Sequence, residues 1–175
     1  MYDLETVKST LADKLRILID PYDTSPTPQP ILSNVIRGEP DLLNLYDGPM
    51  GALIFIHTAE SPQGIDKKGY FNGPQSLGQE RQRWQLNVTG ALVLFVAGMD
   101  DDSDTLVTHL SDVLSDFFHN ENALELPGTI MSSLTTGMSM NWRPITITLE
   151  NMQRPMESLT AAIKFTILVD DTKKV

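Results

Sequence analysis

Residues 96–118 read VAGMDDDSDTLVTHLSDVLSDFF, and this stretch decides how the chain folds. An apolar segment comes first, four aspartates follow within five positions, and leucine, valine and phenylalanine then recur every three or four residues. This recurrence predicts a helix that ends near His119 and is preceded by a strand. The aspartates between them have two interpretations, as ligands of a metal ion or as the start of the helix.

The spacing of the aspartates favours the start of a helix. Asp100, Asp102 and Asp104 match the opening of an EF-hand calcium loop, which also requires glycine at its sixth position and glutamate at its twelfth. This chain has Thr105 and Ser111 at those positions. Aspartate side chains accept hydrogen bonds from the first N–H groups of a helix, and their charge complements the helix dipole. We therefore predict helix capping and no metal site.

The segment before the aspartates predicts a long strand. In RQRWQLNVTGALVLFVAGM, residues 81–99, one face is apolar throughout, while the other becomes apolar only after Gly90. Glycine inside a strand is typical of a bulge or bend, and we expect one here. The polar first half predicts a protruding arm, paired in a hairpin with a strand at 50–60. The second half requires cover on both faces.

Further elements flank this strand and helix. Apolar residues at helical spacing predict a helix at 3–19, which ends before Pro21. The proline-rich residues 21–49 predict an extended connector, with a short turn of structure near 31–36. Residues 60–79, with four glycines and two prolines, predict a long loop. Residues 121–142 fit no single pattern.

The end of the chain predicts two strands, ITITLE and LTAAIKFTILV, joined by a hairpin loop of eight residues, NMQRPMES. Alternation places one set of apolar residues of the second strand inward: Leu159, Ala161, Ile163, Phe165, Ile167 and Val169. The whole order predicts an α+β fold in one domain, residues 1–175. We expect a mostly antiparallel mixed sheet, two main helices packed on one face, and a long inserted loop or hairpin.

Composition and charge disfavour several classes of function. The chain has 23 acidic and 13 basic residues, a net charge of −10, which disfavours specific binding to nucleic acid. It has no cysteine, which excludes disulfides and thiolate metal sites. Its apolar runs reach only about nine residues, too short to span a membrane. The N-terminus lacks the pattern of a secretory signal, so we expect a protein made in the cytoplasm.

The sequence contains no recognisable catalytic motif. Nucleophile-elbow and phosphate-loop patterns are absent, and His57, His109 and His119 lack the spacing of metal ligands. We therefore predict no catalytic residue, no cofactor and no metal. Trp84 and Trp142 fit either the core or a subunit interface. Aromatic, basic and apolar residues of the long loop and the long strand predict a subunit interface made by Lys67, Lys68, Tyr70, Phe71, Arg81, Arg83, Val93 and Phe95.

Four segments together carry a family resemblance: the opening helix MYDLETVKSTLADKL, the strand RWQLNVTGALVLFVAG, the helix DDDSDTLVTHLSDVLSDFF and the closing strand LTAAIKFTILVDD. In order and hydrophobic rhythm this chain resembles the tail-terminator proteins of tailed bacteriophages and contractile injection systems. The resemblance implies a virion protein of the tail or neck that forms a hexameric ring. The ring caps the tail tube, contacts tube and sheath subunits, and meets the head-side connector. DNA passes through its lumen without specific binding, and no catalytic residue is implied.

Two alternatives accompany this interpretation. The proline-rich segment at 21–40 is longer than the resemblance leads us to expect, which favours another neck, head–tail joining, sheath or baseplate component. A protein of a different class, a small-ligand-binding module or an enzyme, would use a cleft under the long loop at 60–79.

Overall fold

The computed structural model of the chain describes residues 4–39, 48–55, 81–98, 100–132, 142–147 and 156–174. In chain order the elements are α1 (Leu4–Arg16), β1 (Asn34–Arg37), β2 (Met50–Phe55), β3 (Arg81–Ala97), α2 (Asp101–His119), β4 (Thr129–Ser132), β5 (Arg143–Ile147) and β6 (Met156–Lys174). The fold is α+β, as predicted, with a mixed sheet that contains all six of these strands.

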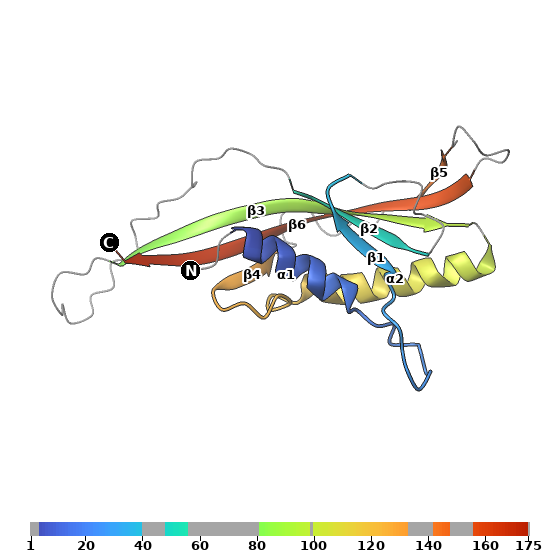
Figure 1. The fold of residues 1–175 in the computed structure, drawn as a ribbon, viewed down its shortest axis with the longest axis horizontal. Helices are drawn as coiled ribbons and strands as arrows, with labels where there is room; N and C mark the ends of the chain where they lie inside the picture. The colour runs from blue at the N-terminus through green and yellow to red at the C-terminus, as the bar shows by residue number, and fades with distance from the viewer. Residues whose placement is uncertain are drawn as a thin grey trace.

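The two long strands β3 and β6 form the centre of the sheet. They pair antiparallel over their whole length, from Arg81 with Lys174 to Ala97 with Ser158. On one side β2 pairs antiparallel with β3, and β1 pairs parallel with β2. On the other side β4 and β5 pair antiparallel with different parts of β6. Figure 1 shows β3 and β6 as two long curved strands to which the shorter strands attach.

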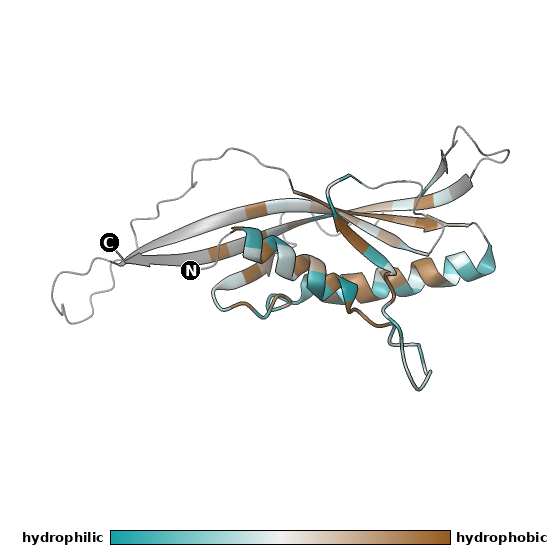
Figure 2. Cartoon of the chain, viewed as in Figure 1, coloured by the Kyte–Doolittle hydropathy of each residue, from teal (hydrophilic) through white to brown (hydrophobic). Residues whose placement is uncertain are grey.

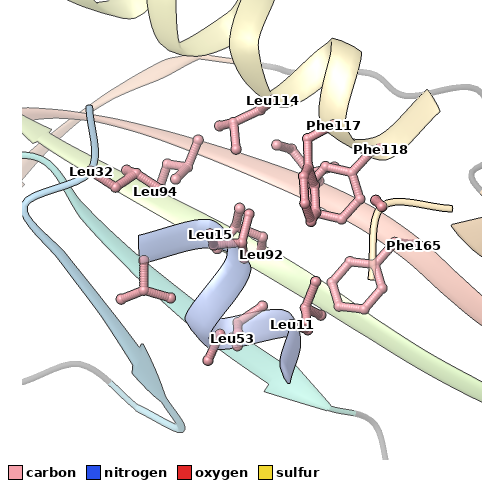
Figure 3. Packing of buried hydrophobic residues seen from close by; sticks show 14 of the residues in the cluster. Leu11, Leu15, Leu32, Leu53, Leu92, Leu94, Leu114, Phe117, Phe118 and Phe165 are labelled. Carbon is pink, nitrogen blue, oxygen red and sulfur yellow. The ribbon is translucent and has the colours of Figure 1, made fainter. Parts of the chain in front are cut away.

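Both helices cover the same face of the sheet, as predicted (Figure 1). Leu11 and Leu15 of α1 and Leu114 of α2 are fully buried against the sheet, together with Leu92 and other strand residues. Figure 3 shows these side chains converging between the helices and the strands. Burying one such side chain contributes about 1.5–3 kcal/mol. The alternating residues of β6 from Ala161 to Val169 are buried in the same core, which confirms the inward face predicted for this strand.

Aromatic side chains fill the middle of this core. The ring of Phe118 stacks on Phe165, with centroids 5.3 Å apart, and Phe117 meets Phe118 edge to face at 5.2 Å. Phe165 lies across the ladder from Gly90. A Cβ added at Gly90 would lie 2.7 Å from Phe165 Cζ and 3.1 Å from Phe55 Cδ1. Glycine is therefore needed here because two phenylalanine rings occupy the space of a side chain.

One expectation for the long strand is wrong. The pairing of β3 with β6 runs unbroken through Gly90, so this residue makes no bulge. β2 pairs antiparallel with β3 from Gly90 to Phe95, as in the expected hairpin, while residues 56–60 lie outside the described residues. The polar half of β3 pairs with β6. The apolar alternation of β6 matches that of β3 on both sides of the glycine, which explains why the two strands stay in register.

The other boundaries are close to those predicted. Helix α1 ends at Arg16, three residues early, although Leu18 still packs against the core. The connector contains a strand, β1, preceded by the buried residues Ile31 and Leu32. The ambiguous segment contains β4, and β5 and β6 form the expected hairpin. The loop at 60–79 lies outside the described residues.

Substituting Gly90 tests whether the glycine is needed for Phe165. Gly90→Ala should destabilise the protein by about 1–3 kcal/mol, because the new methyl group overpacks the core against the Phe165 ring. Phe165→Leu should also destabilise it, through loss of packing, but the double variant should be more stable than the sum of the two effects predicts. Urea unfolding followed by circular dichroism measures all three. Strictly additive effects would contradict this account of Gly90.

Candidate assembly interface

The first turn of α2 confirms the capping interpretation of the aspartates. Oδ1 of Asp100 accepts hydrogen bonds from the Ser103 hydroxyl at 2.7 Å and from the Ser103 backbone N–H at 2.9 Å. These two bonds, the hydroxyl first, hold the pKa of Asp100 below its usual value. Gly98, with φ of 97°, brings the chain into the cap. Among the described residues, no three His, Cys, Asp or Glu side chains are arranged to hold a metal ion.

Helix α2 presents an acidic surface to solvent. Its sequence contains five aspartates and neither lysine nor arginine. All five are exposed: Asp101, Asp102, Asp104, Asp112 and Asp116. Within the described ranges none of them forms an ion pair. Their negative charge is therefore not neutralised by neighbouring basic groups in this part of the structure.

A second contact joins α2 to the start of the proline-rich connector. Nδ1 of His109 lies 2.5 Å from Oδ2 of Asp20. The ring of Tyr22 stacks on His109 with centroids 4.5 Å apart, and the Tyr22 hydroxyl donates to Asp112 at 3.4 Å. These contacts span almost ninety positions of sequence. They give His109 a structural role, in which it joins α2 to the connector.

The connector beyond this contact is an ordered loop of residues 20–30. Its base is closed by the Ile31 N–H, which donates to the Leu18 carbonyl at 2.7 Å. The Ser25 N–H donates to Asp23 Oδ1 at 2.8 Å and is the main cause of the lowered pKa of Asp23. Figure 1 shows the loop projecting away from the sheet on the helix side. Next to it, Ile17 at the end of α1 is 62% exposed.

The remaining histidine and tryptophan predictions have mixed outcomes. Nδ1 of His119 lies 2.7 Å from the Ser115 carbonyl in the last turn of α2, in the structural position expected. Nε1 of Trp142 donates to the Ser111 hydroxyl at 3.0 Å, and the ring packs against the core. His57 lies outside the described residues.

The residues predicted to form an interface fall into three groups. Val93 and Phe95 lie on the sheet face opposite the helices, because they alternate with core residues of β3. Arg81 and Arg83 begin β3, opposite Lys174 and Thr172 of β6 in the ladder. The four loop residues lie outside the described residues: Lys67, Lys68, Tyr70 and Phe71. The structure thus places the arginines and the apolar pair in different halves of one strand.

The sheet face opposite the helices carries its own apolar residues. Met50, Ala52 and Phe95 are buried there and lie outside the main core cluster. Phe95 is 9% exposed, so it has little surface to offer a neighbour, whereas Val93 is half-buried and Ile54 is 40% exposed. Figure 2 shows hydrophobic colour along the second half of β3. The prediction that this half-strand needs cover on both faces agrees with the burial of Phe95.

Two basic residues of α1 have roles that the sequence interpretation missed. Lys8 is 5% exposed, and its Nζ lies 4.8 Å from the centroid of the Phe55 ring. Burial, more than the nearby Arg37 guanidinium, lowers the pKa of Lys8. Arg16 donates from Nε and Nη2 to the Val35 carbonyl, at 3.0 and 2.7 Å, and so covers part of the β1 edge. The sequence signal for the buried position of Lys8 is its place on the apolar face of the helix.

Removing the cap tests the role of Asp100. The pKa of Asp100 is lowered in the folded protein, so its carboxylate stabilises the fold above its unfolded pKa, and this is lost as the pH falls through the folded pKa. Asp100→Ala should therefore lower the melting temperature at neutral pH, and the difference from wild type should shrink in acid. Calorimetry over a pH series measures this. Asp101→Ala is the control, since its side chain makes no capping bond, and an equal loss there would contradict the assignment.

Breaking the His109 contact should loosen the loop at 20–30 and leave α2 intact. In His109→Ala the Tyr22 ring and the Asp20 carboxylate lose their partner, so the backbone N–H groups of Tyr22 and Ser25 should exchange faster with deuterium. Hydrogen exchange with mass spectrometry measures the loop and α2 separately. His119→Ala, at the exposed end of the same helix, should leave the loop unchanged. Unchanged loop exchange in His109→Ala would show that the contact does not order the loop.

Comparison with known proteins assigns no family to this chain. No protein-family model matches it, and no curated protein matches it. Neither of the two helices in the described ranges is long and apolar enough to cross a membrane. The resemblance to tail terminators rests on element order and hydrophobic rhythm, so the function that it implies is a proposal.

Proposed function

We propose that this chain is a structural virion protein, a phage tail terminator that forms a ring, caps the tail tube and joins it to the head-side connector. The α+β fold supports the proposal, since the resemblance implies a small α+β subunit. The protein acts by fitting against copies of itself and its neighbours, and it makes or breaks no covalent bond.

One observation carries the proposal: the apolar sheet face opposite the helices. Ala52, Val93 and Ala162 are neighbours across three strands of this face, and Ile54 lies one row away. Val93 is half-buried, Ile54 is 40% exposed and Ala162 is exposed. Exposed apolar residues that gather on one surface mark interaction sites. A second copy of the chain that covers this face would complete its burial.

Self-assembly into a closed ring accounts for termination. A ring forms when each copy contacts the next through two different surfaces and the rotation between copies closes. A closed ring seated on the end of a tube covers the surface to which the next tube subunit would add. The mechanism is therefore steric and needs only complementary surfaces.

The acidic charge of the chain suits a ring through which DNA moves. Six copies of a chain with net charge −10 would together carry −60 formal charges. Such a field repels phosphate groups. Contact with acidic residues also releases no counter-ions from DNA, whereas this release drives the binding of DNA to basic proteins. DNA would therefore pass through the lumen without adhering to it.

Charged substitutions on the apolar face test the proposal. Wild type should form a ring, alone at high concentration or on the ends of tail tubes from the same phage. Ile54→Glu with Ala162→Glu should weaken self-association at least about tenfold, because two carboxylates would be buried in the contact. Multi-angle light scattering and electron microscopy of tube ends measure this, with circular dichroism to check folding.

Ile17→Glu is the matched control, since this isoleucine is exposed at the end of α1, away from the apolar face. It should assemble like wild type. A wild-type chain that stays monomeric even with tube ends present would overturn the proposal. Binding to sheath or connector subunits in place of tube ends would assign the chain to another position in the neck.

A further inference from the structure

Strands β3 and β6 continue together beyond the described parts of β2 and β4. The pairing of β2 with β3 ends at Gly90, and the pairing of β4 with β6 ends at Val169. The ladder then runs on from Gln85 with Asp170 to its last pair at Arg81. In the described part of the sheet these residues pair only with each other. We call this two-stranded segment, residues 81–85 and 170–174, the arm.

Among the described residues, no third strand pairs with the arm. A two-stranded ribbon is marginally stable in water unless a third strand or a helix packs against it. The last described core side chains before the arm are Val88 and Val169. Unpaired strand edges also attract other chains, and proteins usually protect them. The β1 edge is protected in this way by Arg16, whose guanidinium binds the Val35 carbonyl.

The arm is basic in a chain that is acidic. It contains four basic residues, Arg81, Arg83, Lys173 and Lys174, and two acidic ones, Asp170 and Asp171. The whole chain has a net charge of −10. The arm therefore carries positive charge at the end of an otherwise negative molecule.

The opposite end of the molecule is acidic. Figure 1 shows the end of the arm and the start of α2 at opposite ends of the long axis. Asp101, Asp102 and Asp104 are exposed in the first turn of α2, and that helix contains no lysine or arginine. Figure 2 shows the hydrophilic start of the helix. Charge is thus separated along the length of the chain.

We infer that the arm docks on a second copy of this chain, with its basic end against the acidic surface at the start of α2. The contact is head to tail, because opposite charges attract when the arm of one copy meets the α2 end of the next. Such a contact uses two different surfaces and generates rings or filaments. The inference rests on the self-assembly proposed above and adds to it the surfaces that set the order of the copies.

A second copy fits the arm better than nucleic acid does. The four basic residues would attract the phosphates of a nucleic acid. The rest of the chain has a large excess of acidic residues and would repel the same nucleic acid. Another copy supplies a compact acidic surface and places its own arm away from the contact. Charged contacts at a protein surface are screened over about 8 Å at physiological salt, so the association should weaken as salt rises.

Charge reversal and charge exchange test the inference. Arg81→Glu with Arg83→Glu should weaken self-association at least about tenfold at low salt. Asp102→Lys with Asp104→Lys should weaken it similarly, and Asp100 is left in place to cap the helix. Combining all four substitutions should restore association to within about threefold of wild type, because the two ends exchange charge. Sedimentation velocity measures the association constants, and circular dichroism checks folding.

The matched control is Thr24→Glu with Thr27→Glu, which adds negative charge at two exposed positions of the loop at 20–30, outside both the arm and the apolar face. An equal loss there would mean that overall charge, and not the arm, controls association. Failure of the exchanged variant to recover would also overturn the inference, and so would tighter binding of the arm to a DNA oligonucleotide than to the chain itself. If a variant fails to fold, the salt dependence of the wild-type protein tests the inference. Its association constant must fall at least about tenfold from about 50 to about 500 mM NaCl.

The outcomes separate the two proposals. If wild type forms rings and the reversed-arm variant forms them equally well, the arm inference fails and the proposed function stands. If wild type never associates, alone or on tube ends, the proposed function fails and the inference fails with it.

Discussion

The unbroken pairing of β3 with β6 is the constraint on which the rest of the structure depends. Every other strand is placed by it, since β2 attaches to β3 while β4 and β5 attach to β6. Its continuity through Gly90 depends on one steric fact, that the Phe165 ring fills the space where a side chain would lie. The same ring stacks on Phe118, so this point of the ladder also fixes α2 against the sheet. A bulge there would have moved every later residue of β3 to the wrong face.

One ladder with two different halves produces both a body and an arm. After Gly90 both faces of β3 are apolar, and this half lies between β2 and β6 with the helices on one side. Before Gly90 one face is polar, and the described part of β2 does not extend along it. The strand therefore changes from a buried element to a projecting one without any change in its hydrogen-bonded partner. Both surfaces proposed for assembly, the apolar face and the arm, follow from this change in composition along one strand.

Local features could be predicted from the sequence, and long-range pairing could not. The period and cap of α2 and the inward residues of β6 depend on neighbours within a few positions, and both predictions are confirmed. The partner of the polar half of β3 depends on residues more than eighty positions away, and hydrophobic alternation alone does not choose between two strands with the same rhythm. The bulge predicted at Gly90 was wrong because a glycine inside a strand is found both at bulges and where an aromatic ring packs closely against the backbone. The contact of Asp20 with His109 has no sequence signal at all, and neither has the cover that Arg16 gives to β1.

The charge of α2 exceeds what its folding requires. Only Asp100 makes the capping hydrogen bonds, and the aspartates of the first turn add a favourable interaction with the helix dipole. Asp112 and Asp116 lie beyond that turn, and near the carbonyl end a negative charge opposes the dipole and costs helix stability. No lysine or arginine on the helix offsets them. The exposed aspartates of the first turn lie at the opposite end from the basic arm, so the arm of a second copy is the partner whose charge and position fit them.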